Sequence, residues 1–164
     1  MTTDTKYRSI FGGTSSDSKV GYTGIIVDGT YNVQWIIYTI SGNTYKLFPL
    51  KNLTDHVMNS NGYNTGGYTD SDMYGFVHNT VLPNLKRSGL NITACDLVSR
   101  SIWKDIYSKT GKSSATIAGG ERFWLTGPNS SNYFCYVYSD GSINYDYVAS
   151  FSYGVRPLIT VVKD

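Results

Sequence analysis

Three short β-type runs, separated by turn residues, follow one another between residues 23 and 48. The run TGIIV ends at Asp28-Gly29, the run NVQWIIYTI ends at Ser41-Gly42-Asn43, and TYKLF completes the set. Asp-Gly and Gly-Asn dipeptides between such runs are typical of tight hairpins. These residues therefore predict a small antiparallel meander, and this excludes an all-helical bundle.

A helix and a mixed element are predicted after the meander. The run 59–68, NSNGYNTGGY, is a loop by its turn residues, and Asp70 or Ser71 then offers an N-cap. Met73, Phe76, Val77 and Val81 recur at helical spacing until Pro83 interrupts the helix. Residues 91–109 predict a strand and then, from about Ser99, a helix that places Ile102, Trp103 and Ile106 on one side.

The remaining elements complete an α+β pattern with small antiparallel sheets, one or two helices and long loops. Residues 109–121 are expected to form a loop. Ser139-Asp140-Gly141-Ser142 predicts a hairpin turn between YFCYVY and INYDYV, and VRPLITVV predicts a closing strand. Residues 1–20 contain the run GGTSSDS and are expected to form a flexible lead or tether, so the domain would span 21–164.

Charge and hydropathy limit the classes of partner. The chain has 164 residues, a formal net charge of +2, 16% charged residues and no basic cluster longer than Lys86-Arg87. Nucleic acid and anionic membranes are therefore not expected as partners. No secretory signal and no run of about 20 apolar residues occurs, so we expect synthesis in a cytosol and no membrane insertion.

The segment from Trp124 to Tyr153 has a composition unlike that of an ordinary strand pair. It contains six Tyr, six Ser and three Asn, and its only formal charges are Asp140 and Asp146. Tyr supplies a large amphipathic contact surface and Ser and Asn supply adaptable hydrogen bonds, as in antibody paratopes. We therefore expect a rigid hairpin, displayed in water with its flanking loops, that binds a ligand. The alternative is that the tyrosines only pack within the sheet.

Strand alternation assigns sides within this hairpin. If Val137 and Ile143 face the core, Tyr136 and Tyr138 lie on the opposite, exposed face together with Asn144 and Asp146, while Tyr145 and Tyr147 are partly buried. The loops before and after the hairpin are expected to be exposed. The candidate ligand-binding residues are therefore Asn129, Ser130, Ser131, Asn132, Tyr133, Tyr136, Tyr138, Asn144, Asp146, Ser150, Phe151, Ser152 and Tyr153.

Other conspicuous residues are predicted to be structural. Trp35, Trp103 and Trp124 are expected in the core, and Arg156 is expected to hold loop carbonyls as a buried or half-buried guanidinium. Cys95 and Cys135 lie in apolar runs, which favours buried thiols over a disulfide.

No catalytic, cofactor or metal site is predicted. Thr110-Gly111-Lys112-Ser113 resembles the end of a phosphate loop, but Ile106 stands where that motif needs its first glycine. His56 and His78 have no partners at zinc spacing and are expected to decorate the surface. Asp140, Asn144 and Asp146 leave open a weak calcium site.

Four stretches of the chain resemble a bacterial and phage domain family with a C-type-lectin-like fold. They are GYNTGGYTDSDMYGFV, FWLTGP, VYSDGSINYD and YGVRPLITV. The most specific part combines Tyr153-Gly154-Val155-Arg156-Pro157 with Phe123-Trp124-Leu125, and the resemblance covers Gly21 to Val162. It implies a compact domain with neighbouring termini and with loops and a hairpin on one face.

The resemblance also suggests a function. Domains similar to this one serve as variable, ligand-binding proteins of diversity-generating retroelements, whose mutagenesis of Asn codons yields mainly residues such as Asn, Tyr, Ser and Asp. Residues 129–152 are rich in that set. The calcium motifs of sugar-binding lectins do not match, because Gly127-Pro128-Asn129 lacks the acid of the first motif.

Three functions remain in competition. The first is a display domain, such as a phage receptor-binding or fibre-tip module, that binds a host cell-surface protein or glycan, with the N-terminal segment joining other virion proteins. The second is a virion structural or decoration protein. The third is an enzyme similar to formylglycine-generating oxidases, which the separation of Cys95 and Cys135 disfavours. The expected location is the virion, with the bacterial cytoplasm or the cell surface as alternatives, and a homo-oligomer is left open.

Overall fold

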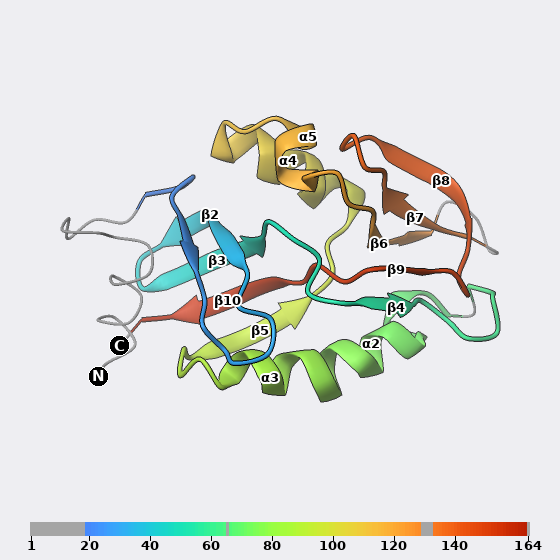
Figure 1. Cartoon of the computed structure of the whole chain (residues 1–164), viewed down its shortest axis with the longest axis horizontal. Helices are drawn as coiled ribbons and strands as arrows, with labels where there is room; N and C mark the ends of the chain where they lie inside the picture. Colours follow the sequence, from blue (N-terminus) through green and yellow to red (C-terminus); the bar gives the residue numbers. More distant parts are fainter. Residues whose placement is uncertain (1–18, 65, 129–132, 164) are drawn as a thin grey trace.

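Two five-stranded sheets and two main helices form the α+β fold of the computed structural model, which describes residues 19–64, 66–128 and 133–163 (Figure 1). The first sheet has the order β1-β2-β3-β10-β5 and is antiparallel throughout. Its strands are β1 (Thr23–Ile25), β2 (Gln34–Ser41), β3 (Thr44–Pro49), β5 (Ile92–Asp96) and β10 (Leu158–Val162). The predicted meander and closing strand are confirmed.

The second sheet carries the late, tyrosine-rich segment and has the order β4-β9-β6-β7-β8. β6 and β9 run parallel, and the other neighbours are antiparallel. Its strands are β4 (Asp55–Val57), β6 (Phe123–Pro128), β7 (Tyr133–Val137), β8 (Ile143–Val148) and β9 (Ser152–Gly154). Asp140 stabilises the predicted hairpin turn between β7 and β8, since its carboxylate accepts hydrogen bonds from the backbone and hydroxyl of Ser142 at 2.9 and 2.6 Å.

A continuous helical rod covers one face of the first sheet (Figure 1). It consists of α2 (Asp72–Phe76), a π-helical segment η3 (Val77–Val81) and α3 (Leu82–Lys86), and it follows a short 3₁₀ turn, η2 (Tyr68–Asp70). Ser71 caps it by accepting from the backbone N–H of Tyr74 at 3.1 Å. The prediction that Pro83 ends the helix is wrong. Pro83 falls at the start of α3, directly after the wider π turn, where its missing N–H and its ring are tolerated.

Two further helices cover the opposite face of that sheet: α4 (Arg100–Thr110) and α5 (Ser114–Ala118). α4 begins directly after Ser99, which confirms the predicted start of this helix, and Ser99 is its N-cap. Trp103 and Ile106 are buried, but Ile102 is wrongly assigned to that side because it is exposed. The loop predicted for residues 109–121 contains α5, whose N-cap is Ser113. None of the helices among the described residues is long and apolar enough to cross a membrane.

Alternation along β2 divides the core between these two helical layers. Trp35 and Ile37 pack toward the helical rod, while Ile36 and Tyr38 pack with α4 and α5. The three tryptophans are fully buried, as predicted. Both cysteines are buried thiols outside any disulfide between described residues, as expected.

Arg156, in the segment between β9 and β10, is fully buried and hydrogen-bonded to backbone carbonyls, which confirms its predicted structural role. Its guanidinium donates to the carbonyls of Ile117 and Ala118 at 2.7 Å each, at the C-terminal end of α5. It also lies over the ring of Phe123, with 4.4 Å between the guanidinium carbon and the ring centroid. Burial lowers the pKa of Arg156 to about 10, so the group still carries its charge at neutral pH.

Candidate functional site

The second sheet places an aromatic stack beneath the candidate binding residues. Tyr136 of β7 and Tyr153 of β9 stack with 4.9 Å between ring centroids and 13° between ring planes. Trp124 of β6 meets the Tyr153 ring at 5.1 Å and donates its indole N–H to the carbonyl of His56 at 2.9 Å. The stack therefore joins strands from distant parts of the sequence and holds β9 in place.

Tyr136 is buried, which corrects the prediction that it lies on an exposed face. Its side chain is 1% exposed and belongs to the same core cluster as Trp124. The predicted alternation itself is confirmed, because Tyr136 lies opposite Asn144, and Val137 lies opposite Ile143. The two sides of β7 nevertheless both face the interior, since Val137 belongs to the other core cluster. Alternation separates core from surface only where one face of a strand meets water.

The hairpin turn packs against the body of the domain through Gly141, contrary to expectation, although Asp140 and Ser142 are exposed. Gly141 is buried, and its carbonyl accepts from the indole N–H of Trp103 at 3.3 Å. A Cβ at this position would meet the backbone of Ser114 at 2.4 Å, so the turn lies directly against the start of α5. A further exposed surface of the late segment lies at the other end of β8.

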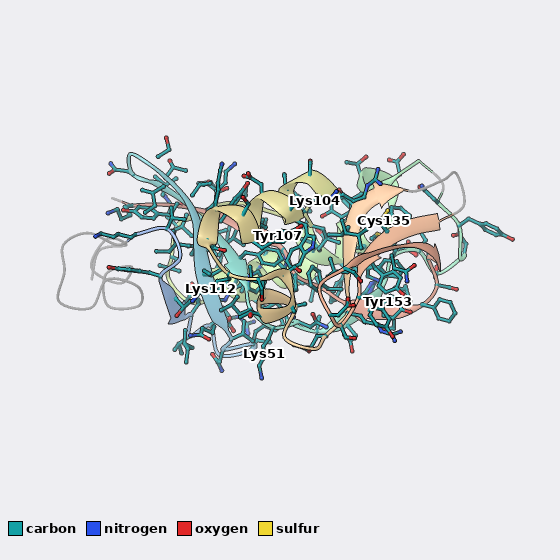
Figure 2. All side chains as sticks on the ribbon, turned by 90° about the horizontal axis from the view of Figure 1, so that it is seen from above. Lys51, Lys104, Tyr107, Lys112, Cys135 and Tyr153 are labelled. Carbon is teal, nitrogen blue, oxygen red and sulfur yellow. The ribbon has the colours of Figure 1, made fainter. Side chains whose placement is uncertain are left out.

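The turn between β8 and β9 provides that surface. Ser150, Phe151 and Ser152 are exposed, with Phe151 at 49%. The Phe151 ring lies 6.3 Å from that of Tyr153, so the exposed ring adjoins the buried stack. Figure 2 shows Tyr153 at the end of the molecule formed by the second sheet, whereas Tyr107 and Lys112 lie toward the first sheet.

The structure places the other predicted residues as follows. Tyr138 and Tyr153 are half-buried, and Asn144 is exposed. Tyr133 and Asp146 lie in β7 and β8, but their side chains are outside what the structure describes, as are those of Tyr145 and Tyr147. The predictions for Asn129, Ser130, Ser131 and Asn132 fall outside the described residues altogether.

Arg122 joins the site although the sequence does not point to it. Its guanidinium donates to the Tyr138 hydroxyl at 3.0 Å and lies over the Tyr138 ring at 4.3 Å from the centroid. Hydrogen bonding to Tyr153 raises the pKa of Arg122, and Tyr138 adds to this effect. The guanidinium therefore fixes both half-buried tyrosines.

A hollow of about 270 Å³ opens beside Tyr153. Carboxylate, amide, guanidinium, hydroxyl and phenol groups meet in it; the lining residues are Asn52, Asp55, Glu121, Arg122, Ser152, Tyr153 and Gly154. Gly154 allows the close approach of Asn52, because a Cβ there would meet the Asn52 amide at 2.0 Å. The sequence pointed to Ser152 and Tyr153 but not to the other lining residues, since β4 and β9 have three residues each and show no periodic signal.

Two other clusters lie outside this site. His78, expected only to decorate the surface, contacts the Asp96 carboxylate through Nε2 at 2.7 Å, and Tyr68 donates to the same oxygen at 3.0 Å. A second hollow, of about 530 Å³, lies at the start of α4 and is lined by Ser99, Arg100, Ser101, Lys104 and Gly127. Among the described residues, no group of three His, Cys, Asp or Glu side chains could hold a metal ion.

Comparison of the chain with family models, with curated proteins and with solved structures found no match.

Proposed function

We propose that this domain is a ligand-binding display protein with a C-type-lectin-like fold. Two features support that fold: the first and last strands belong to one sheet, and the late hairpin belongs to a second sheet. The proposed protein is a phage receptor-binding module or a retroelement-diversified variable protein, assembled into a virion in the host cytoplasm. Its ligand would be a host cell-surface protein or glycan.

The observation that carries this proposal is the exposure of Phe151 on the β8–β9 turn. Transfer of a large apolar side chain out of water lowers the free energy, so covering the exposed Phe151 ring with another molecule is favourable. The turn adjoins the stack of Tyr153 on Tyr136, which limits the conformational entropy lost on binding.

A matched pair of serine substitutions tests the proposal. Ser150→Arg places a bulky cation on the proposed face, and Ser108→Arg places the same group on the exposed side of α4. We expect Ser150→Arg to reduce adsorption to host cells at least tenfold and Ser108→Arg to leave it unchanged, with similar melting temperatures. Equal adsorption by both variants would contradict the proposal.

An assembly subunit is a second candidate, which the open edge of β1 favours. The side chains of Ile25, in β1, and of Val27, two residues later, are 55% and 69% exposed. The Tyr22 carbonyl accepts a hydrogen bond from the backbone N–H of Ile37, and the backbone N–H of Ile26 donates to the Val33 carbonyl. Because backbone groups alternate in direction along a strand, those of Thr23 and Ile25 point to the open edge. No described strand covers that edge. Apolar edge strands without charged residues readily pair with another chain.

The cysteines give the oxidase alternative no support. Burial raises the pKa of the Cys95 thiol to about 12, which opposes formation of the reactive thiolate at neutral pH. Cys135 is buried within the opposite core cluster. We therefore propose a binding function that requires no cofactor and no nucleic acid.

A further inference from the structure

A second uncharged run of Tyr, Asn and Ser occurs far earlier in the chain, at residues 59–68. Its sequence, NSNGYNTGGY, has the composition that distinguishes the late segment, and it contains no formal charge. Turn formation explains the glycines of this run. It does not explain the exposure of Tyr63, whose side chain is 62% exposed.

The fold brings this loop against the β8–β9 turn. β4 pairs with β9, and Val57 lies opposite Ser152. The contact continues beyond the strands, because the backbone N–H of Asn59 donates to the carbonyl of Ala149 at 2.9 Å. Figure 1 shows the loop after β4 and the β8–β9 turn at the same end of the molecule, opposite the end of β10.

Asn59 fixes the loop in this position. Its side chain is buried and donates to the carbonyl of Tyr63 at 2.8 Å, while its Oδ1 accepts from the backbone N–H of Asp72 at 2.9 Å. The Asp72 carboxylate in turn accepts from the backbone N–H of Ser60 at 2.8 Å. These bonds tie the loop to the first turn of α2, so Tyr63 is displayed from a backbone that is already ordered.

We infer that the loop 59–64 and the turn 149–152 form one composite binding surface, and that its partner is a folded protein. This inference rests on the proposed function and extends it to a second loop. Tyr63 and Phe151 supply the aromatic contacts, while Ser60, Asn61, Ser150 and Ser152 supply exposed polar groups around them.

The shape of this surface favours a protein over a glycan. Small ligands are normally enclosed in concave sites, but neither Tyr63 nor Phe151 lines either hollow. Two projecting rings on separate loops instead fit a partner that is broad enough to receive both, as aromatic anchors do in protein interfaces. The loop 59–64 and the turn 149–152 contain no formal charge, so binding should depend little on salt.

The experiment measures binding of the full chain to intact cells of a bacterial strain whose genome or phage carries the gene. The cells are used untreated, after trypsin digestion of surface proteins, and after periodate oxidation of surface glycans. We expect trypsin to remove binding and periodate to leave it unchanged. Tyr63→Ala and Phe151→Ala should each weaken binding about tenfold or more. Tyr22→Ala, an exposed tyrosine beside β1, is the matched control.

Each contrary result has a separate meaning. Wild-type binding by Tyr63→Ala, with binding lost in Phe151→Ala, would overturn the composite surface and leave the proposed function standing. Binding that survives trypsin and disappears after periodate would overturn the protein partner. If untreated cells bind nothing, or if Phe151→Ala and Ser150→Arg have no effect, the proposed function itself fails. Unchanged thermal unfolding of Tyr63→Ala shows that any loss is not caused by misfolding.

Discussion

Arg156 and Asn52 are 104 positions apart in the sequence, yet the Arg156 Nε–H donates to Asn52 Oδ1 at 2.8 Å. The same amide donates through Nδ2 to the carbonyl of Arg122 at 2.9 Å. A buried guanidinium and one side-chain amide thus connect the segment before β10 to the start of β6, the strand that carries Trp124. The hollow beside Tyr153 is built on this connection.

Replacing Arg156 should destabilise the whole domain. Arg156→Lys keeps the charge but cannot reach Asn52, Ile117 and Ala118 together, so buried acceptors lose their donors. We expect a loss of about 3 kcal/mol or more in the free energy of unfolding, measured by urea denaturation. Lys163→Arg, on the ring of Tyr45 near the end of the chain, is the control and should change stability little. A stable Arg156→Lys variant would contradict the structural role.

A methyl group at position 154 should be poorly tolerated. The Cβ of Gly154→Ala would lie within 2.0 Å of the Asn52 amide, and this amide cannot move without releasing Arg156 and the Arg122 carbonyl. We expect a lower melting temperature and a disturbed hollow. Gly120→Ala is the comparison, since its Cβ would meet nothing within 4 Å although its φ of +81° also strains an alanine. Melting temperatures from calorimetry should therefore fall further for Gly154→Ala.

Truncation of Tyr136 should lower the free energy of unfolding much more than truncation of Phe151. Tyr136→Ala removes a fully buried ring and leaves a cavity beside Trp124, so the free energy of unfolding should fall by about 3 kcal/mol or more. Phe151→Ala removes a ring that is half exposed, and stability should change by less than about 1 kcal/mol. Equal destabilisation by the two substitutions in chemical denaturation would show that Phe151 is part of the core.

Acid should loosen the loop 59–64 before it unfolds the domain. Hydrogen bonding from the backbone of Ser60 lowers the pKa of Asp72 below its ordinary value of 3.8. A lowered folded-state pKa means that this stabilisation is present above the unfolded value and is lost as the pH falls through the folded value. The protection factors of the Ser60 and Tyr63 amides, which are the exchange rates of an unstructured peptide at the same pH divided by their own, should therefore fall below about pH 4. In Asp72→Asn, these protection factors should already be lower at pH 6, and their further decrease in acid should be absent.

A charge on the open edge of β1 tests the assembly alternative. Ile25→Lys places a charged group on an exposed side chain and should leave the fold unchanged. If the domain associates through this edge, the substitution should convert oligomers to monomers in light scattering. Thr39→Lys is the control, because Thr39 lies on β2 inside the first sheet and its substitution does not place a charge on the open edge. A monomeric wild type at high concentration would remove the support that the edge gives to this alternative.

Local turn chemistry and periodicity predicted much of the fold. The hairpin signals of residues 23–48, the cap at Ser71, the helix start near Ser99 and the turn at Asp140 all depend on neighbouring residues, and each is confirmed. The helix through Pro83 was missed because a π turn changes the local requirement for hydrogen bonds. α5 was missed because five residues are too few to show a period.

The candidate site was harder to predict because it depends on pairings between distant segments. Tyr136 alternates as expected, but only the tertiary structure shows that helices and strands cover both faces of its strand. Arg122, Asn52 and Asp55 reach the site through the parallel contact of β6 with β9 and the short pairing of β4 with β9. Neither pairing leaves a pattern in the sequence. Exposure was predicted correctly at Asn144 and at the β8–β9 turn, and wrongly at Tyr136.

The burial of β7 on both faces limits how this segment can evolve. Substitutions at Phe134 to Val137 would damage one side of the interior or the other, so a randomised library that includes these four codons would consist largely of unfolded members. The turn at Ser150 to Ser152 has no such restriction. Under the proposed binding function, new specificities should therefore arise through changes at a few surface codons, while the rings beneath them stay the same.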